Sequence, residues 1–278
     1  MMERLNELYR EDIPTIVDEH KVLNPESREI LFTTCSLADK LTESVTVFTS
    51  RPKYNKPTFT RTPLYIDPIE PDENGIINGY TNGEIIGVNP YIVPKTNLFY
   101  KFTKKLKESR NPFAKYLIKK LERPVENLLE TIVHEKLHVE TQLKEMYVGD
   151  GRKTTFINDV YQATIEYLEE KLKAPKAFKP FIKYFAKKLV IPAVEGLNQL
   201  ATRKVLKEAK HTYEENTTYD LYGLYTELAA NALEAQGIQR PIEFYRQWIE
   251  RGYKTVKDFV SNFLEAIKNY NGSRYAYA

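Results

Sequence analysis

The sequence predicts an α+β protein with a small antiparallel sheet followed by a mainly helical C-terminal half. Residues 44–93 contain short runs with period-two alternation and repeated Asn-Gly pairs, whereas from about residue 95 the apolar residues recur at helical spacing. The five residues HEKLH at 134–138 lie on one of these predicted helices. We expect the sheet to pack against the helix that carries them.

The first 43 residues are predicted to form short helices. Pro14 interrupts this segment, and a second break occurs at 24–27, which reads NPES. Asn24 and Ser27 both have side chains that can accept a hydrogen bond from a free N–H group of the first helical turn. Either residue can therefore serve as the N-cap of the helix that follows, REILFTTCSLADKL.

Residues 44–93 are predicted to form an antiparallel sheet of three to five strands. SVTVFTS (44–50) and PTFTRTPLYI (57–66) alternate β-branched and polar residues, which is typical of half-buried strands. Asn-Gly pairs follow at 74–75, 78–79 and 82–83. Both residue types tolerate a positive φ, so the pairs favour the tight turns of β-hairpins.

The remaining elements are predicted to be helices. The helix with HEKLH opens at Pro124, which suits a first helical turn, and stops before Gly149. Further helices are expected at 155–172, 177–189, 193–209, 218–235, 241–250 and 254–270, the last with Thr255 and Asp258 spaced like a capping box. We expect four segments: N-terminal helices at 1–43, sheet and motif helix at 44–150, a basic helical insert at 151–217, and C-terminal helices at 218–278.

The composition is typical of a globular protein, with 42% hydrophobic and 28% charged residues. The charged N-terminus lacks the apolar core of a signal peptide, and no apolar run is long enough to span a bilayer. The single cysteine, Cys35, excludes an internal disulfide framework and is typical of a reducing compartment. We therefore predict a cytoplasmic protein in which Cys35 is a small core residue rather than a nucleophile.

Positive charge is concentrated at 171–210, which contains eleven Lys or Arg against two glutamates, Glu195 and Glu208. Aromatic residues between these lysines would suit nucleic acid or an anionic membrane surface. The simpler interpretation places the lysines on the solvent face of helices whose aromatic residues form the core. We expect weak, non-specific binding of nucleic acid at most.

The motif HEKLH has the spacing of a zinc site on a helix. Residues four apart lie on the same face, so His134 and His138 can bind one ion through their imidazole nitrogens. Glu135 projects about 100° away around the helix. It can take a proton from a water molecule at the open coordination position. The alternative is a chance match, with two solvated histidines on a surface helix.

Together with NGEIIGVNP at 82–90, this helix resembles the edge strand and active-site helix of the zincin metallopeptidases, in particular their gluzincin branch. The resemblance implies Zn²⁺ as the cofactor, hydrolysis of a peptide bond as the reaction, and a peptide or protein as the substrate. In that family the edge strand runs beside the cleft and pairs with an extended peptide. Lys136 and Glu140 depart from the family pattern, which prefers uncharged residues beside the motif.

The gluzincin resemblance also implies a third ligand, a glutamate on a later helix with Asp or Asn four residues further on. Asp159, Glu166 and Glu227 are the candidates. Asp159 and Glu166 fall opposite the apolar arc of their helix, where we expect them to face solvent. Glu227 and Asn231 lie together at the margin of an apolar face, in the sequence ELAAN. We therefore predict Glu227 as the third ligand, with Asn231 bracing a ligand histidine.

A group that stabilises the oxyanion is also needed, and His211, Tyr219 and Tyr222 precede the Glu227 helix. The leading hypothesis is a zinc-dependent peptidase in which Glu135 activates water. A second hypothesis is a catalytically inactive zincin-like protein that binds a protein or nucleic acid through its basic helices. A third is a helical nucleic-acid-binding protein in which HEKLH is accidental.

Overall fold

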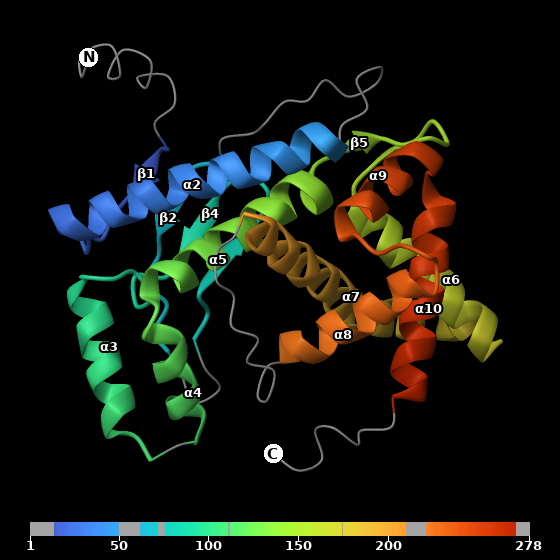
Figure 1. Cartoon of the computed structure of the whole chain (residues 1–278). Helices are drawn as coiled ribbons and strands as arrows, with labels where there is room; N and C mark the ends of the chain where they lie inside the picture. The colour runs from blue at the N-terminus through green and yellow to red at the C-terminus, as the bar shows by residue number, and fades with distance from the viewer. Residues whose placement is uncertain are drawn as a thin grey trace. The chain divides into compact units, whose positions relative to one another are not determined.

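The computed structural model describes residues 14–49, 62–71, 76–110, 112–173, 175–209 and 221–270. The fold is α+β and mostly helical, with a small sheet near the N-terminus and a helical C-terminal half (Figure 1). The predicted fold class is confirmed at this level. The chain divides into two compact units, one of residues 1–42 and 60–136, the other of residues 43–59 and 137–278.

The sheet of the first unit is mixed, with the strand order β1-β2-β4-β3. Its strands are β1 (Ile16–Val17), β2 (Leu64–Ile66), β3 (Gly79–Thr81) and β4 (Ile86–Val88). β1 pairs with β2 and β2 with β4 in parallel, and only β3 and β4 are antiparallel. The prediction of an antiparallel sheet is therefore wrong for two of the three pairings. The long connection between β1 and β2 lets these strands pair in parallel, whereas a short loop forces β3 and β4 into a hairpin.

The β3–β4 hairpin turns at one of the predicted Asn-Gly pairs. Asn82 Oδ1 accepts hydrogen bonds from the backbone N–H groups of Glu84 and Ile85, at 2.9 and 3.0 Å. Gly83 has a φ of 93°, which a residue without a Cβ adopts at little cost. This turn makes β3 the edge strand of the described sheet and β4 an inner strand. The prediction that segment 82–90 is itself the edge strand is therefore wrong.

Helix α2 (Pro25–Thr49) begins where the sequence predicts and ends later. Asn24 Oδ1 accepts from the Ser27 N–H at 2.8 Å, and Ser27 Oγ accepts from the Asn24 N–H at 2.9 Å. This reciprocal pair confirms Asn24 as the cap. The helix continues through residues 44–49, so the predicted strand at 44–50 is wrong. Val45 is buried within it, and packing of this kind outweighs the weak β-propensity of β-branched residues.

Three further helices complete the first unit: α3 (Asn97–Glu108), α4 (Pro112–Leu121) and α5 (Pro124–Leu137). The edge strand β3 lies directly against α5. A Cβ added to Gly79 would come within 2.8 Å of Thr131 Cγ2 and 3.3 Å of Glu135 Cγ. Only glycine allows this approach, so the sheet packs on the motif helix as predicted.

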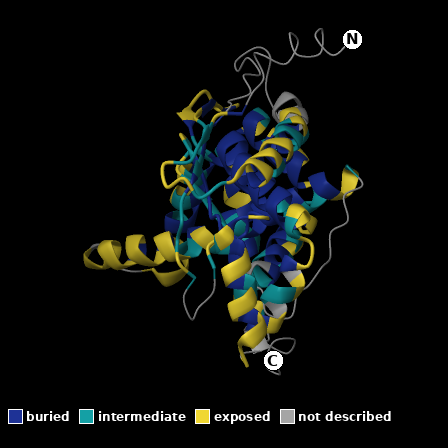
Figure 2. Cartoon of the chain, turned by 90° about the vertical axis from the view of Figure 1, so that its left-hand side faces the viewer, coloured by how far each residue is buried: buried dark blue, intermediate teal, exposed yellow. Residues whose placement is uncertain are grey.

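The second unit is built mainly from helices, joined by a short hairpin of β5 (Met146–Tyr147) and β6 (Lys153–Thr154). The helical elements are η1 (His138–Leu143), α6 (Phe156–Leu172), η2 (Lys176–Phe178), α7 (Lys179–Glu208), α8 (Leu221–Glu234), α9 (Pro241–Arg251) and α10 (Tyr253–Asn269). Most lie close to their predicted bounds. Figure 2 shows helices whose turns pass between buried and exposed positions, as expected for amphipathic helices.

Three details of the helices differ from the predictions. The helix with HEKLH, predicted to stop just before Gly149, ends at Leu143, and Met146–Tyr147 form strand β5. The helices predicted at 177–189 and 193–209 form the single helix α7, which continues through Pro192. Proline removes one backbone hydrogen bond, and the buried residues that follow it keep the helix intact. The predicted capping box at α10 is absent, because the N-cap is Gly252 and the Thr255 hydroxyl donates to the Gln247 carbonyl.

A cluster of aromatic rings forms the core where α6 meets α9. The Phe156 ring lies edge-on to the rings of Phe244, Tyr245 and Trp248, with centroids 5.9, 5.2 and 5.3 Å apart. All four side chains are almost completely buried. Edge-to-face contacts of this kind add to the stabilisation from burial of the ring surface.

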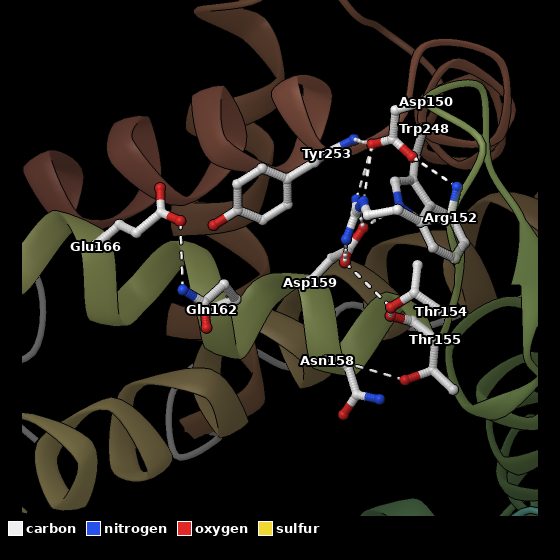
Figure 3. A network of polar contacts seen from close by, with 10 residues as sticks. All are labelled: Asp150, Arg152, Thr154, Thr155, Asn158, Asp159, Gln162, Glu166, Trp248 and Tyr253. Atoms are coloured by element: carbon white, nitrogen blue, oxygen red, sulfur yellow. Dashed lines mark hydrogen bonds and ion pairs between the residues drawn. The ribbon is translucent and has the colours of Figure 1, made fainter.

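The buried carboxylate of Asp159 links this aromatic core to the β5–β6 hairpin through hydrogen bonds (Figure 3). Asp159 is 2% exposed and accepts hydrogen bonds from Arg152 Nη1 at 2.9 Å, Thr154 Oγ1 at 3.1 Å and Trp248 Nε1 at 2.9 Å. The Asp150 carboxylate also accepts hydrogen bonds from Arg152. It accepts a further hydrogen bond from the backbone N–H of Tyr253. The prediction that Asp159 faces solvent is wrong, because polar partners satisfy it inside the core.

Asp159→Ala is expected to lower the free energy of unfolding by about 2–4 kcal/mol, because it leaves the Trp248 N–H without an acceptor and removes one of the two carboxylates that bind Arg152. Chemical denaturation monitored by tryptophan fluorescence would measure this change. The matched control is Asp258→Ala in α10, whose side chain is exposed and which should shift stability by less than about 0.5 kcal/mol. Equal effects of the two substitutions would contradict this structural role of Asp159.

Candidate metal centre

Three side chains form a group that could hold a metal ion: His134, His138 and Glu195. One ligand atom from each lies within 4.8 Å of the others. His138 Nε2 is 3.3 Å from Glu195 Oε2. Both histidines are buried, and Glu195 is partly exposed. Buried imidazoles beside a carboxylate are a more specific arrangement than two solvated histidines, so the structure contradicts a surface location for HEKLH.

The two histidines lie at a change of helical geometry. Helix α5 ends at Leu137, and residues His138–Leu143 form the π-helical turn η1. The turn ends with the Lys144 N–H bonded to the Val139 carbonyl at 3.2 Å, a five-residue step. Such turns are rare and occur frequently at functional sites, because they redirect side chains without ending the helix.

Gln142 orients the ring of His138. His138 Nδ1 lies 2.5 Å from Gln142 Oε1. The amide nitrogen of Gln142 donates to the Val194 carbonyl at 3.2 Å and lies 2.5 Å from the Tyr245 hydroxyl. Because a carbonyl only accepts, the NH₂ group must face Val194, and the amide oxygen must face the histidine. His138 Nδ1 therefore donates to this amide oxygen, and Nε2 is the ring atom that faces Glu195.

This orientation determines the electrostatics of the group. His138 Nε2 and a carboxylate oxygen of Glu195 face each other at 3.3 Å. The contact is favourable when a proton or a metal cation lies between the two atoms. Burial of Tyr245, next to Gln142, raises the pKa of its hydroxyl, so this partner stays neutral.

The donor set fits a transition-metal ion. Two imidazole nitrogens and one carboxylate oxygen are the ligands of catalytic zinc sites, which leave a fourth position open. The same donors also occur in iron(II) sites with two histidines and one carboxylate. The geometry therefore identifies a group suited to a divalent ion and does not select the element.

The third member of this group is the carboxylate Glu195, and Glu227 is not a member of it. Glu227 is partly exposed in α8, and Asn231, one turn later, is exposed. The side chain that contacts His138 Nδ1 is that of Gln142, so the role predicted for Asn231 stays a prediction. Helix α7 carries Glu195, so the basic segment contributes to the site and is not a separate insert beside it.

The other predicted residues have different positions. Glu166 forms an ion pair with Lys257 at 3.1 Å; burial alone would raise the pKa of its carboxyl, but hydrogen bonds, above all from Lys257, hold that pKa below its ordinary value. Asp159 belongs to the core network described above. His211 and Tyr219 lie outside the described residues, so their assignment as oxyanion stabilisers stays a prediction. The side chain of Tyr222 is likewise outside the description.

The two charged residues that depart from the zincin pattern are buried and paired. Lys136 forms an ion pair with Asp39 of α2, and Lys144 lies 3.5 Å from Glu140. A buried charge is tolerated when a partner of opposite sign compensates it. Lys136 and Glu140 therefore belong to the packing of this helix. Cys35 is buried nearby in α2, and burial raises the pKa of its thiol to about 11, which confirms its assignment as a core residue.

A sequence signal for Glu195 exists. It is the only charged residue in the run LVIPAVEGLNQLA, which is otherwise apolar apart from two amides. In the composition of segment 171–210, Glu195 is only one of two acidic residues. The neighbouring Gly196 packs against the Tyr225 backbone of α8, so no side chain larger than glycine fits there. The isolated charge in an apolar run therefore indicates that Glu195 lies partly inside the fold, but it does not indicate its partner.

The chain matches no protein-family model, no curated protein and no solved structure. Within the described residues, none of the helices combines the length and apolar character needed to cross a membrane. Function is therefore inferred from the geometry of the His134, His138 and Glu195 group.

Glu195→Ala is expected to weaken zinc binding by more than the roughly 10–100-fold typical of residues that only orient ligands. Glu227→Ala is the matched control and should leave the affinity nearly unchanged. Each variant would be stripped of metal and reloaded with zinc. Competition with a chromogenic chelator would then measure its zinc affinity. The opposite ranking would restore Glu227 as the third ligand and remove Glu195.

Gln142→Leu is expected to reduce zinc affinity by about 10–100-fold, because the His138 ring loses the acceptor that fixes its tautomer and orientation. Thr164→Val controls for the loss of a buried polar group, since the Thr164 hydroxyl donates to the Val160 carbonyl within α6. Calorimetric titration gives the affinity, and the melting temperature of the metal-free protein reports general damage. An unchanged affinity in Gln142→Leu would show that Gln142 serves packing alone.

Proposed function

We propose that this chain is a zinc-dependent peptidase that hydrolyses peptide bonds in a peptide or protein substrate. The observation that carries the proposal is the buried group in which Glu195 joins the two histidines of HEKLH. It supplies the two-histidine, one-glutamate donor set that the resemblance to gluzincins requires. Among the hypotheses drawn from the sequence, an accidental motif accounts least well for this convergence.

In this proposal His134, His138 and Glu195 hold the zinc ion. When bound, zinc polarises the substrate carbonyl and makes a water molecule more acidic. The ligand side chains come from η1, the end of α5 and the middle of α7, which are rigid helices rather than loops. Rigid elements keep the donor atoms in place without the entropic cost of ordering a loop.

Glu135 is the proposed general base. It follows His134 directly and is 8% exposed, so its carboxylate lies largely out of bulk water. Its carboxylate accepts the proton of the attacking water, and the resulting acid can return that proton to the leaving amine. Atoms balance, because water supplies the hydroxyl of the new acid and the hydrogen of the new amine.

The edge strand β3 is the proposed contact for the substrate backbone. It lies against α5 at Thr131 and Glu135, and it ends the described sheet. An extended peptide can add to such an edge through main-chain hydrogen bonds, which makes recognition partly independent of side chains. The missing side chain of Gly79 keeps this strand close to the proposed base.

Glu135→Gln is expected to lower the rate of peptide hydrolysis by about 10²–10⁴-fold, because an amide cannot accept the proton of water. Zinc content and melting temperature should stay close to those of the wild type. Glu126→Gln, in the exposed first turn of the same helix, is the matched control and should retain full activity. Cleavage of a broad peptide library, read by mass spectrometry, provides the measurement.

Two outcomes would reject the peptidase. A wild-type protein that binds stoichiometric zinc yet cleaves no library peptide would support the inactive, zincin-like binding protein. A protein purified without chelator that carries no metal, and whose melting temperature zinc does not raise, would remove the site itself.

A further inference from the structure

The first half of α7 is buried along one narrow line only. Ile182, Ala186 and Val190, spaced by four residues, are buried, and the first two pack with Ile165 of α6. Tyr161 and Leu168 of α6 lie against the same cluster. The rest of this half-helix contributes little to the core.

The opposite side of the half-helix presents large apolar side chains to water. The exposed fraction is 54% for Phe178, 64% for Phe181, 59% for Tyr184, 56% for Phe185 and 57% for Ile191. At about 100° per residue, those on α7 fall on the side away from the buried line. We call these five residues the aromatic face. The prediction that these aromatic residues form the core is wrong.

The aromatic face is surrounded by positive charge. Residues 171–191 contain seven lysines and no Asp or Glu. Lys171 and Lys179 reach glutamates of other helices, Glu265 at 2.9 Å and Glu169 at 3.6 Å. Lys183, Lys187 and Lys188 are exposed among the aromatic residues, and Lys188 Nζ lies 5.9 Å from the centroid of the Tyr184 ring. Apolar rings and lysines therefore share one exposed surface.

From this combination we infer that the aromatic face binds an anionic lipid surface. A helix with exposed aromatic residues and flanking lysines lies in the membrane interface, with its rings among the upper acyl chains and its lysines at the lipid phosphates. The charge complementarity is to the lipid headgroups, and the apolar rings supply the insertion. This mode needs no membrane-spanning helix and does not depend on the proposed peptidase activity.

Nucleic acid fits this surface less well. Proteins that stack bases on aromatic rings place those rings in a positively charged groove that follows the strand. The aromatic face is the exposed side of a single helix. Its phenylalanine rings carry no polar group that could hydrogen-bond to a base. Flat lipid surfaces suit such a convex face better.

The test is co-sedimentation of the full chain with phosphatidylcholine vesicles, with and without phosphatidylglycerol. The wild type should bind the anionic vesicles, and binding should weaken as salt is raised. Phe181→Ser with Phe185→Ser should reduce binding at least about tenfold, because two rings no longer insert. Lys183→Glu with Lys187→Glu should have a similar effect through charge.

Matched controls lie on α3. Tyr100 is 52% exposed, and Lys104 and Lys107 are exposed on the same helix. Tyr100→Ser, and Lys104→Glu with Lys107→Glu, change surface and net charge comparably and should leave binding within about twofold. Circular dichroism would verify that every variant is folded.

Three results would overturn the inference. Failure of the wild-type protein to sediment with anionic vesicles would overturn the inference, whatever the variants do. Equal binding to neutral vesicles, or equal loss in the α3 controls, would show that the aromatic face and its lysines are not the binding surface. Salt-sensitive binding to an oligonucleotide without binding to vesicles would assign the surface to nucleic acid.

Discussion

The contact between His138 and Gln142 determines the geometry of the candidate metal centre. The amide of Gln142 accepts from His138 through its oxygen and donates to the Val194 carbonyl through its nitrogen. Val194 directly precedes Glu195, so one buried amide positions two members of the group at once. The π-helical turn brings Gln142 into this position, and the Tyr245 hydroxyl of α9 holds its other side. A site assembled in this way is orientated before any ion binds, which reduces the cost of binding.

Buried charge has a different role elsewhere in the second unit. Asp159 lies inside the aromatic core, yet its partners Arg152, Thr154 and Trp248 satisfy it by hydrogen bonds. The Asp159 network therefore stabilises the packing of α6 on α9 and the neighbouring hairpin. Glu195 contrasts with it, because its carboxylate lies 3.3 Å from a histidine nitrogen of the metal-ligand group. Partners, rather than burial alone, distinguish a structural carboxylate from a candidate ligand.

Helix α7 combines two surfaces in one element. Its second half is largely buried and contains Glu195 and Gly196, whereas its first half exposes the aromatic face. Pro192 lies where the two halves meet. Ile191 precedes Glu195 by four residues, or about 6 Å along the helix axis. The candidate metal centre and the proposed lipid-binding surface are thus neighbours along one helix, and a structural change in α7 would affect both.

The sequence by itself determined the features that depend on local spacing. The HEKLH motif placed two histidines on one helical face, the NPES stretch marked the start of α2, and Asn82-Gly83 marked the β3–β4 turn. Most helices of the C-terminal half followed from the period of their apolar residues. These features need only the backbone geometry of a few consecutive residues, which a sequence pattern records directly.

Tertiary structure alone decided the features that depend on distant partners. The parallel pairings of β1, β2 and β4, the helical state of residues 44–49 and the choice of Glu195 over Glu227 all rest on contacts between segments far apart in the chain. Glu195 and His138 are 57 residues apart, and no local pattern specifies which carboxylate packs against the histidine. Their meeting depends on how α7 packs against η1 and α9, and that packing is set by the shapes of whole helices rather than by any short motif.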